Sequence, residues 1–199
     1  MSIVFTDTET SGLIPKFASY TDLRVMPHLI QLAAIRTDDE GGNEEKRIDL
    51  IIRPDNYLIP KESSDIHGIT HERAMDEGID LREAMEEYHS MLKGGATLAC
   101  YNVAFDSKIL AASFRRAGAT SEHVFKPGRR HLCVMLAATP VVNLPSNNPR
   151  YNNPAWPKLF VAVEKLLGRP MRDGAHNALV DIEETIEVFK FLKSKGHIW

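Results

Sequence analysis

The sequence predicts an α/β protein with a mixed sheet of five strands flanked by helices. Apolar segments at 3–10, 28–36 and 48–53 come first, and their connections favour an antiparallel arrangement of three strands. After residue 60, helical patterns alternate with buried apolar segments at 96–101 and 131–138. An antiparallel start followed by alternating helices and strands is typical of a mixed sheet with helices on its faces.

Local signals define the helices. Residues 80–93 have an amphipathic pattern that begins at Asp80, a good N-cap, and ends before two glycines. Other helices that end at a glycine are expected at about 103–117, 156–167 and 178–194. Segment 131–138 is expected to pass from strand to helix. The stretch 139–158 contains several prolines and asparagines and predicts a long surface loop.

The 199 residues are expected to form one domain, 1–199, of a soluble protein. There is no signal-peptide pattern and no apolar run close to the ~20 residues that span a bilayer. Cys100 and Cys133 lie in apolar runs, which indicates reduced core thiols and a cytoplasmic location. The net charge of −3 argues against broad, charge-driven coating of nucleic acid.

Asp7 and Glu9 lie two positions apart at the end of the first strand. Because side chains alternate along a strand, both carboxylates should point to the same face, where they repel each other. A hard cation such as Mg²⁺ or Mn²⁺ would offset this repulsion. A solvated acidic turn is the alternative on this stretch alone.

Two later segments share the pattern Asn-x-x-x-Asp, from Asn102 to Asp106 and from Asn177 to Asp181. In each, Asn is a candidate N-cap and Asp lies in the first helical turn, where it also stabilises the helix without any catalytic role. His176 precedes the second cap. Inside the same helix it would point about 140° away from Asp181, so it is expected in the connection before the helix.

Together these groups fit one reaction. Four carboxylates can hold two divalent ions about 4 Å apart, and an imidazole can accept a proton from water near neutral pH. This combination favours metal-assisted hydrolysis of a phosphodiester.

Three segments, Asp7-Thr8-Glu9, residues 101–106 and His176-x-x-x-x-Asp181, resemble the motifs of the histidine-bearing (DEDDh) branch of the DEDD exonuclease superfamily. His67-Gly68-Ile69-Thr70 looks like the substrate-side segment of that family. Residues 31–38 are especially similar to the nuclease domains of the bacterial exonuclease I family. The epsilon proofreading subunits of DNA polymerase III are wider relatives.

The resemblance implies a ribonuclease-H-like fold and removal of nucleoside 5′-monophosphates from the 3′ end of single-stranded DNA. It implies two Mg²⁺ or Mn²⁺ ions, with Asp7, Glu9 and Asp181 on one metal and Asp7 bridging to the second. Asp106 would act there through water, and His176 would be the general base.

The resemblance also implies contacts with the terminal nucleotides. The residues expected there are Thr8, Thr10, Leu13, His67, Ile69, Asn102 and Phe105. Core packing is the alternative for Leu13, Ile69 and Phe105. In the loop, Arg150, Tyr151, Trp156 and Lys158 could stack on bases and contact phosphates, or the loop could be a linker.

The chain departs from its relatives in several places. Gln31 stands where many carry Glu, and Tyr101 where many carry His.

Members of the exonuclease I family continue into further domains that embrace single-stranded DNA, so high processivity is expected to need an oligomer or a partner, such as a polymerase or a single-strand-binding protein. Two alternatives stay open: an RNA-trimming exoribonuclease of the same branch, and a catalytically dead nucleic-acid-binding or polymerase-associated module.

Overall fold

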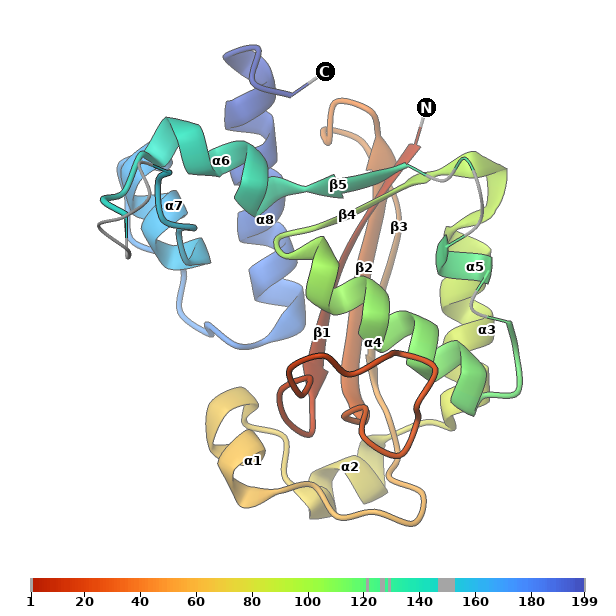
Figure 1. The fold of residues 1–199 in the computed structure, drawn as a ribbon. Helices are drawn as coiled ribbons and strands as arrows, with labels where there is room; N and C mark the ends of the chain where they lie inside the picture. The colour runs from red at the N-terminus through yellow and green to blue at the C-terminus, as the bar shows by residue number, and fades with distance from the viewer. Residues whose placement is uncertain (1, 121, 126–127, 129, 147–152, 199) are drawn as a thin grey trace.

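The computed structural model describes residues 2–120, 122–125, 128, 130–146 and 153–198 (Figure 1). In this part of the chain the strands are β1 (Ser2–Thr10), β2 (Leu29–Asp38), β3 (Glu44–Ile51), β4 (Thr97–Cys100) and β5 (His131–Cys133). The helices are α1 (Lys61–His67), α2 (His71–Glu77), α3 (Leu81–Met91), α4 (Val103–Arg116), α5 (Glu122–Phe125), α6 (Val134–Val142), α7 (Leu159–Leu167) and α8 (Ala178–Ser194), with a 3₁₀ turn, η1 (Lys93–Gly95).

The five strands form one mixed sheet in the order β3-β2-β1-β4-β5. β1 pairs with β2, and β2 with β3, in antiparallel fashion, whereas β4 lies parallel to β1 and β5 lies parallel to β4. The predicted fold class is therefore confirmed, and β1 is the central strand.

Helices cover both faces of the sheet (Figure 1). On one face α3, α4 and α5 pack over a core that includes Val4 of β1. On the other face α6, α7 and α8 pack over Ile3 and Phe5, and the Phe5 ring meets Phe189 of α8 edge-on at 5.1 Å. The alternation along β1 thus sends successive side chains into two different cores.

The helices α1 and α2 lie beyond the edge of the sheet where β1 ends and β2 begins (Figure 1). They surround a small core of Ile30, Ile59, Ile69 and Ala74. The return from α2 is held to the sheet, because the backbone of Ile79 forms hydrogen bonds with that of residues 51 and 53.

Several predicted boundaries were wrong. β3 begins at Glu44, earlier than expected, because the Asp38 carboxylate accepts hydrogen bonds from the backbone of residues 40, 42 and 43 and closes a tight hairpin turn. The short helices α2 and α5 carry too few apolar positions to show a periodic pattern, and the sequence analysis missed both.

The predicted loop at 139–158 is also shorter than expected. α6 continues to Val142 with Pro140 inside it, so the proline does not end the helix. The following helix begins at Leu159 instead of 156. Trp156 and Lys158 are exposed, whereas Arg150 and Tyr151 lie outside the described residues.

Cys100 and Cys133 are neighbours in the β4–β5 pairing and are both free thiols, as expected. No helix in the described ranges combines the length and the apolar character that crossing a membrane requires.

Gly78 lies at the junction between α2 and the sheet, so a substitution there tests how closely the two backbones pack. A Cβ at this position would lie 2.3 Å from the Ala74 carbonyl oxygen and 2.6 Å from the Arg53 nitrogen, both backbone atoms that cannot move alone. Gly78→Ala should lower the free energy of unfolding by about 1–3 kcal/mol, measured by urea denaturation. Gly42→Ala is the control because its Cβ would meet open space. Equal effects of the two substitutions would contradict the close packing.

Candidate active site

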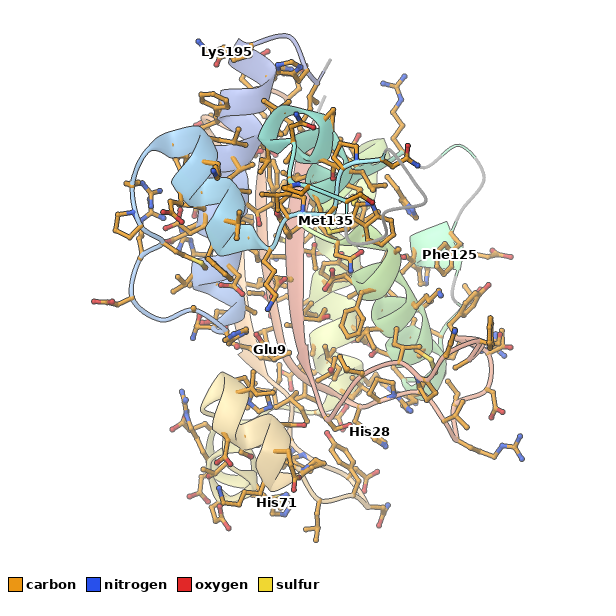
Figure 2. The ribbon with its side chains drawn as sticks, turned by 60° about the vertical axis from the view of Figure 1, so that its left-hand side comes forward. Glu9, His28, His71, Phe125, Met135 and Lys195 are labelled. Atoms are coloured by element: carbon orange, nitrogen blue, oxygen red, sulfur yellow. The ribbon has the colours of Figure 1, made fainter. Side chains whose placement is uncertain are left out.

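Asp7 and Glu9 project from the C-terminal half of β1, on the same face as Phe5. The register with β2 shifts directly after Glu9, so regular pairing ends where the carboxylates lie. Figure 2 shows Glu9 at this end of β1, between the start of α8 and α1. The predicted common face of the pair follows from the alternation of the strand.

Thr8, between the two acids, points to the opposite face. Its hydroxyl donates a 2.8 Å hydrogen bond to Oδ1 of Asp106, which lies in the first turn of α4 and is 3% exposed. The prediction that Asn102 caps α4 was wrong in detail: Asn102 occupies the N-cap position, but its side chain makes no capping hydrogen bond. The contact with Thr8 orients the Asp106 carboxylate toward β1.

α8 brings the fourth carboxylate. The Asn177 side chain accepts hydrogen bonds from the backbone of residues 179 and 180, as predicted for an N-cap. Asp181 lies in the first turn of this helix, and its Oδ1 is buried without a hydrogen-bond partner among the described residues. A buried oxygen of this kind is costly unless a ligand reaches it.

His176 lies just before the cap, outside the helix, where the geometric argument placed it. It is exposed and its φ of +66° lies in the left-handed region, which is uncommon for a residue with a side chain. Ligand atoms of Glu9, His176 and Asp181 all lie within 4.8 Å of one another. This constellation joins β1, α8 and the connection before α8.

The four acids of the site all have raised pKa values, because they are buried and some of them repel one another. Burial, followed by the charges of Asp106, Asp181 and Glu9, raises the pKa of Asp7 well above its usual range. Burial and the charges of Asp181 and Asp106 raise the pKa of Glu9 to about 8. Burial raises the pKa of Asp106 to about 7, and it raises the pKa of Asp181 to about 6 despite the opposing effect of His176.

These residues fit a divalent metal ion. Carboxylate oxygens and an imidazole are its usual ligands, and a cation would relieve the raised pKa values and satisfy Oδ1 of Asp181. Glu9, His176 and Asp181 are near enough to share one ion, with Asp7 and Asp106 beside them.

The predicted substrate residues have varied environments. Leu13 is 87% exposed and Asn102 is exposed, whereas Ile69 is 2% exposed within the small core near α1. Phe105 is half-buried against the core under α4.

Two further residues on the predicted list are buried but polar. Thr10 donates to the Gly12 carbonyl oxygen at 2.7 Å. His67 accepts the Ile69 backbone N–H at Nδ1, while its buried Nε2 has no partner among the described residues.

Gln31 is a supporting residue that the sequence analysis noted only as a departure from relatives. Its side chain is 3% exposed, donates to Oδ1 of Asp49 at 2.7 Å and accepts the Ala178 backbone N–H at 3.3 Å. It therefore joins β2 and β3 to the first residue of α8. The sequence did contain a signal for this role, because Gln31 is a polar residue within a predicted buried, apolar strand.

Comparisons with known proteins agree with this arrangement. The sequence model of the exonuclease family RNase_T matches residues 4–189. No curated protein matches the chain in a sequence search.

Among solved structures, the zinc-bound complex of Escherichia coli exonuclease I with single-stranded DNA has a TM-score of 0.75 and 22% identity, covering 98% of this chain and 40% of that one. The complex of the same enzyme with a dA16 oligonucleotide has a TM-score of 0.76 and 22% identity, covering 97% and 41%. The chain thus spans about two-fifths of the length of these structures. The likeness establishes a ribonuclease-H-like fold, and because the family model covers most of the sequence, the chain belongs to the RNase_T exonuclease family, within the DEDD superfamily of 3′→5′ exonucleases.

Proposed function

We propose that the chain is a metal-dependent 3′→5′ exonuclease that hydrolyses single-stranded DNA and releases nucleoside 5′-monophosphates. One observation carries the proposal: Asp7, Glu9, Asp106 and Asp181, from three separate elements, converge with His176 at one end of β1. DNA is favoured over RNA because the fold neighbours include exonuclease I bound to DNA oligonucleotides. A polymerase or a single-strand-binding protein is the partner class that would present such 3′ ends.

In this proposal Asp7, Glu9, Asp106 and Asp181 would hold two Mg²⁺ or Mn²⁺ ions. Bound divalent ions supply Lewis-acid chemistry, lowering the pKa of water and stabilising charge on a phosphate. Thr8 keeps Asp106 oriented through its hydroxyl.

His176 is the proposed general base. Its ring is exposed, so a water molecule can reach it, and the Glu9 and Asp181 carboxylates beside it stabilise the positive charge that the ring gains with the proton. The water oxygen bonds to phosphorus as its proton passes to the imidazole, and the P–O3′ bond breaks. The 3′-oxygen left on the shortened strand takes up a proton, and the nucleotide leaves as its 5′-monophosphate.

The terminal nucleotides would lie across the same end of the sheet. Leu13 offers an exposed apolar surface for a base, and the free Nε2 of His67 offers one polar contact. The other proposed contacts come from Thr8, Thr10, Ile69, Asn102 and Phe105.

The first prediction concerns activity itself. A 5′-labelled DNA ladder with Mg²⁺ or Mn²⁺ should shorten from its 3′ end, and Asp7→Asn should slow this by at least about 10³-fold, because losing a metal ligand removes several kcal/mol of charge stabilisation. Glu87→Gln, at an exposed acid on α3, is the control.

A matched RNA ladder identifies the sugar preference, since the 2′-OH is the group that the site accepts or refuses. Faster RNA shortening would assign the chain to exoribonucleases. Tight binding of 3′ ends without turnover in either metal would show a binding module with inactive chemistry.

His176→Ala should lower kcat by about 10²–10⁴-fold, the usual contribution of a general base. Mn²⁺ affinity, measured by calorimetry, should change by only a few-fold, with His197→Ala as a control at an exposed histidine. A near-normal rate would remove the base assignment, and a large loss of Mn²⁺ affinity would make His176 a ligand instead.

Stability should depend on pH because the carboxylates have raised pKa values. Without metal, these four acids bind more protons in the folded chain than in the unfolded chain, whereas His28 and His67, whose pKa values are lowered, bind fewer below about pH 6.5. The free energy of unfolding should therefore fall as the pH rises from about 6.5 to 8, where only the acids still titrate. Mn²⁺ should restore stability, and more so at pH 8 than at pH 6, since it binds the ionised acids.

Asp7→Asn provides the matched test in EDTA. It should weaken the pH dependence and raise the free energy of unfolding at pH 8 by roughly 1–3 kcal/mol, whereas Asp55→Asn on the surface should not. A pH-independent stability in EDTA would show that the acids do not repel one another as described.

A further inference from the structure

The connection between α7 and α8, residues 168–177, carries His176 and buries little of itself. Residues 172–176 are all exposed and form no helix or strand. Gly174 has φ of +96° and His176 has φ of +66°, so the backbone also adopts conformations that residues with side chains rarely adopt. Within the stretch, the Asn177 backbone N–H donates to the Gly174 carbonyl oxygen at 3.0 Å and closes a turn around His176. The exposed backbone before this turn needs contacts from outside as well.

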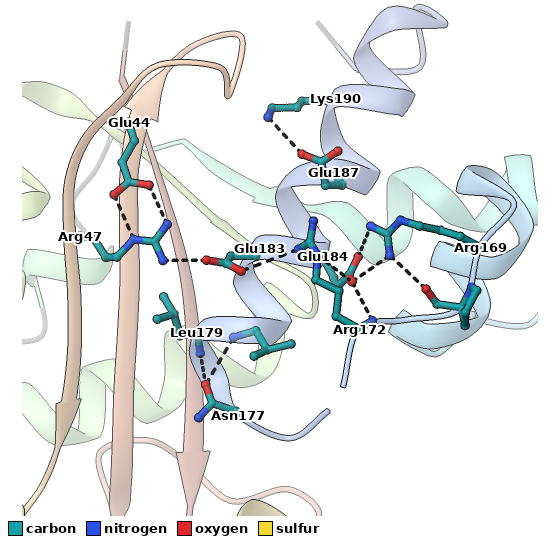
Figure 3. A network of polar contacts seen from close by, with 12 residues as sticks. Glu44, Arg47, Arg169, Arg172, Asn177, Leu179, Glu183, Glu184, Glu187 and Lys190 are labelled. Carbon is teal, nitrogen blue, oxygen red and sulfur yellow. Dashed lines mark hydrogen bonds and ion pairs between the residues drawn. The ribbon is translucent and has the colours of Figure 1, made fainter. Parts of the chain in front are cut away.

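Glu184 provides those contacts. It lies one turn after Asp181 in α8, and its side chain is fully buried. Nη1 and Nη2 of Arg169 donate to its two carboxylate oxygens at 2.9 and 2.7 Å, and the Arg172 backbone N–H donates to Oε1 at 3.0 Å (Figure 3). A two-pronged arginine–carboxylate pair fixes orientation as well as distance.

A second acid on α8 extends the network. Glu183 lies 3.7 Å from the Arg172 guanidinium and accepts a 2.6 Å hydrogen bond from Arg47 (Figure 3). Arg47 also pairs with Glu44, both of them in β3. The connection is thereby tied to α8 and, through α8, to the sheet.

Residues three apart lie side by side on a helix, so Asp181 and Glu184 occupy neighbouring places on α8. At the first position the helix fixes the Asp181 carboxylate itself. At the second position Glu184 fixes the connection that bears His176. We propose that Glu184, through Arg169 and Arg172, is a positioning residue that holds His176 over the candidate active site. This inference rests on the proposed exonuclease function.

Arg169→Ala tests the proposal without removing the buried acid. It deletes both side-chain hydrogen bonds to Glu184 but leaves the contact with the Arg172 backbone. On single-stranded DNA kcat should fall about 10-fold or more, with KM within about 2-fold, as for supporting partners of site residues. Arg169→Lys should recover part of the rate. The control Lys190→Ala breaks the half-buried ion pair with Glu187, also on α8, and should leave kcat unchanged.

A double-mutant cycle distinguishes positioning from a general structural role. In the His176→Ala background, Arg169→Ala should cost less than about 2-fold in kcat, because the side chain that it positions is already gone. An undiminished loss in that background would overturn the proposal. Wild-type kcat in Arg169→Ala would do the same.

Hydrogen exchange provides a readout that does not depend on activity. Backbone amides of residues 171–177 should exchange faster in Arg169→Ala than in the wild type or in Lys190→Ala, and unchanged exchange would overturn the anchoring. A wild-type chain that cleaves nothing would overturn the proposed function instead, and the exchange measurement would still decide whether the network holds this stretch.

Discussion

Mutual repulsion among four buried or half-buried carboxylates sets the main constraint on this structure. Each acid comes from an element that is secured elsewhere: Asp7 and Glu9 from the central strand, Asp106 through Thr8, and Asp181 from a helix whose start is capped by Asn177. Burial is the larger cause of the raised pKa values of Asp7 and Glu9, and the charges of the neighbouring acids raise them further in the absence of a cation. Rigid anchoring and unfavourable charge together make a site that is prepared for a positively charged ligand.

The two sides of the candidate site differ in rigidity. Asp7 and Glu9 lie on a rigid strand, whereas His176 lies on a stretch that polar contacts hold in place. β1 lies between β2 and β4 and packs on both faces, so Asp7 and Glu9 move only with the sheet. His176 sits on an exposed stretch whose nearest fixed points are polar contacts. A group that must accept a proton and release it benefits from such access, whereas metal ligands benefit from rigidity.

Periodic features of this chain could be predicted from the sequence. The alternation of β1 placed Asp7 and Glu9 on one face, and the turn angle of a helix placed His176 outside α8. Contacts between distant residues had no such signal. The pairing of Arg169 with Glu184 and the contact of Thr8 with Asp106 depend on which elements meet in space, and the same spacing that made Asn102 a candidate cap did not bring its side chain to the backbone.

The side-chain amide of Gln31 links the residue types that fit at positions 31 and 49. Its nitrogen donates to Asp49 and its oxygen accepts from α8, so both ends of the amide are committed. A glutamate at this position could still accept from α8 but would face Asp49 with a second negative charge. Glutamate at 31 beside aspartate at 49 would therefore cost free energy, less so because Asp49 is exposed to water, and a hydrogen-bond donor at 49 would suit an acidic residue at 31 better.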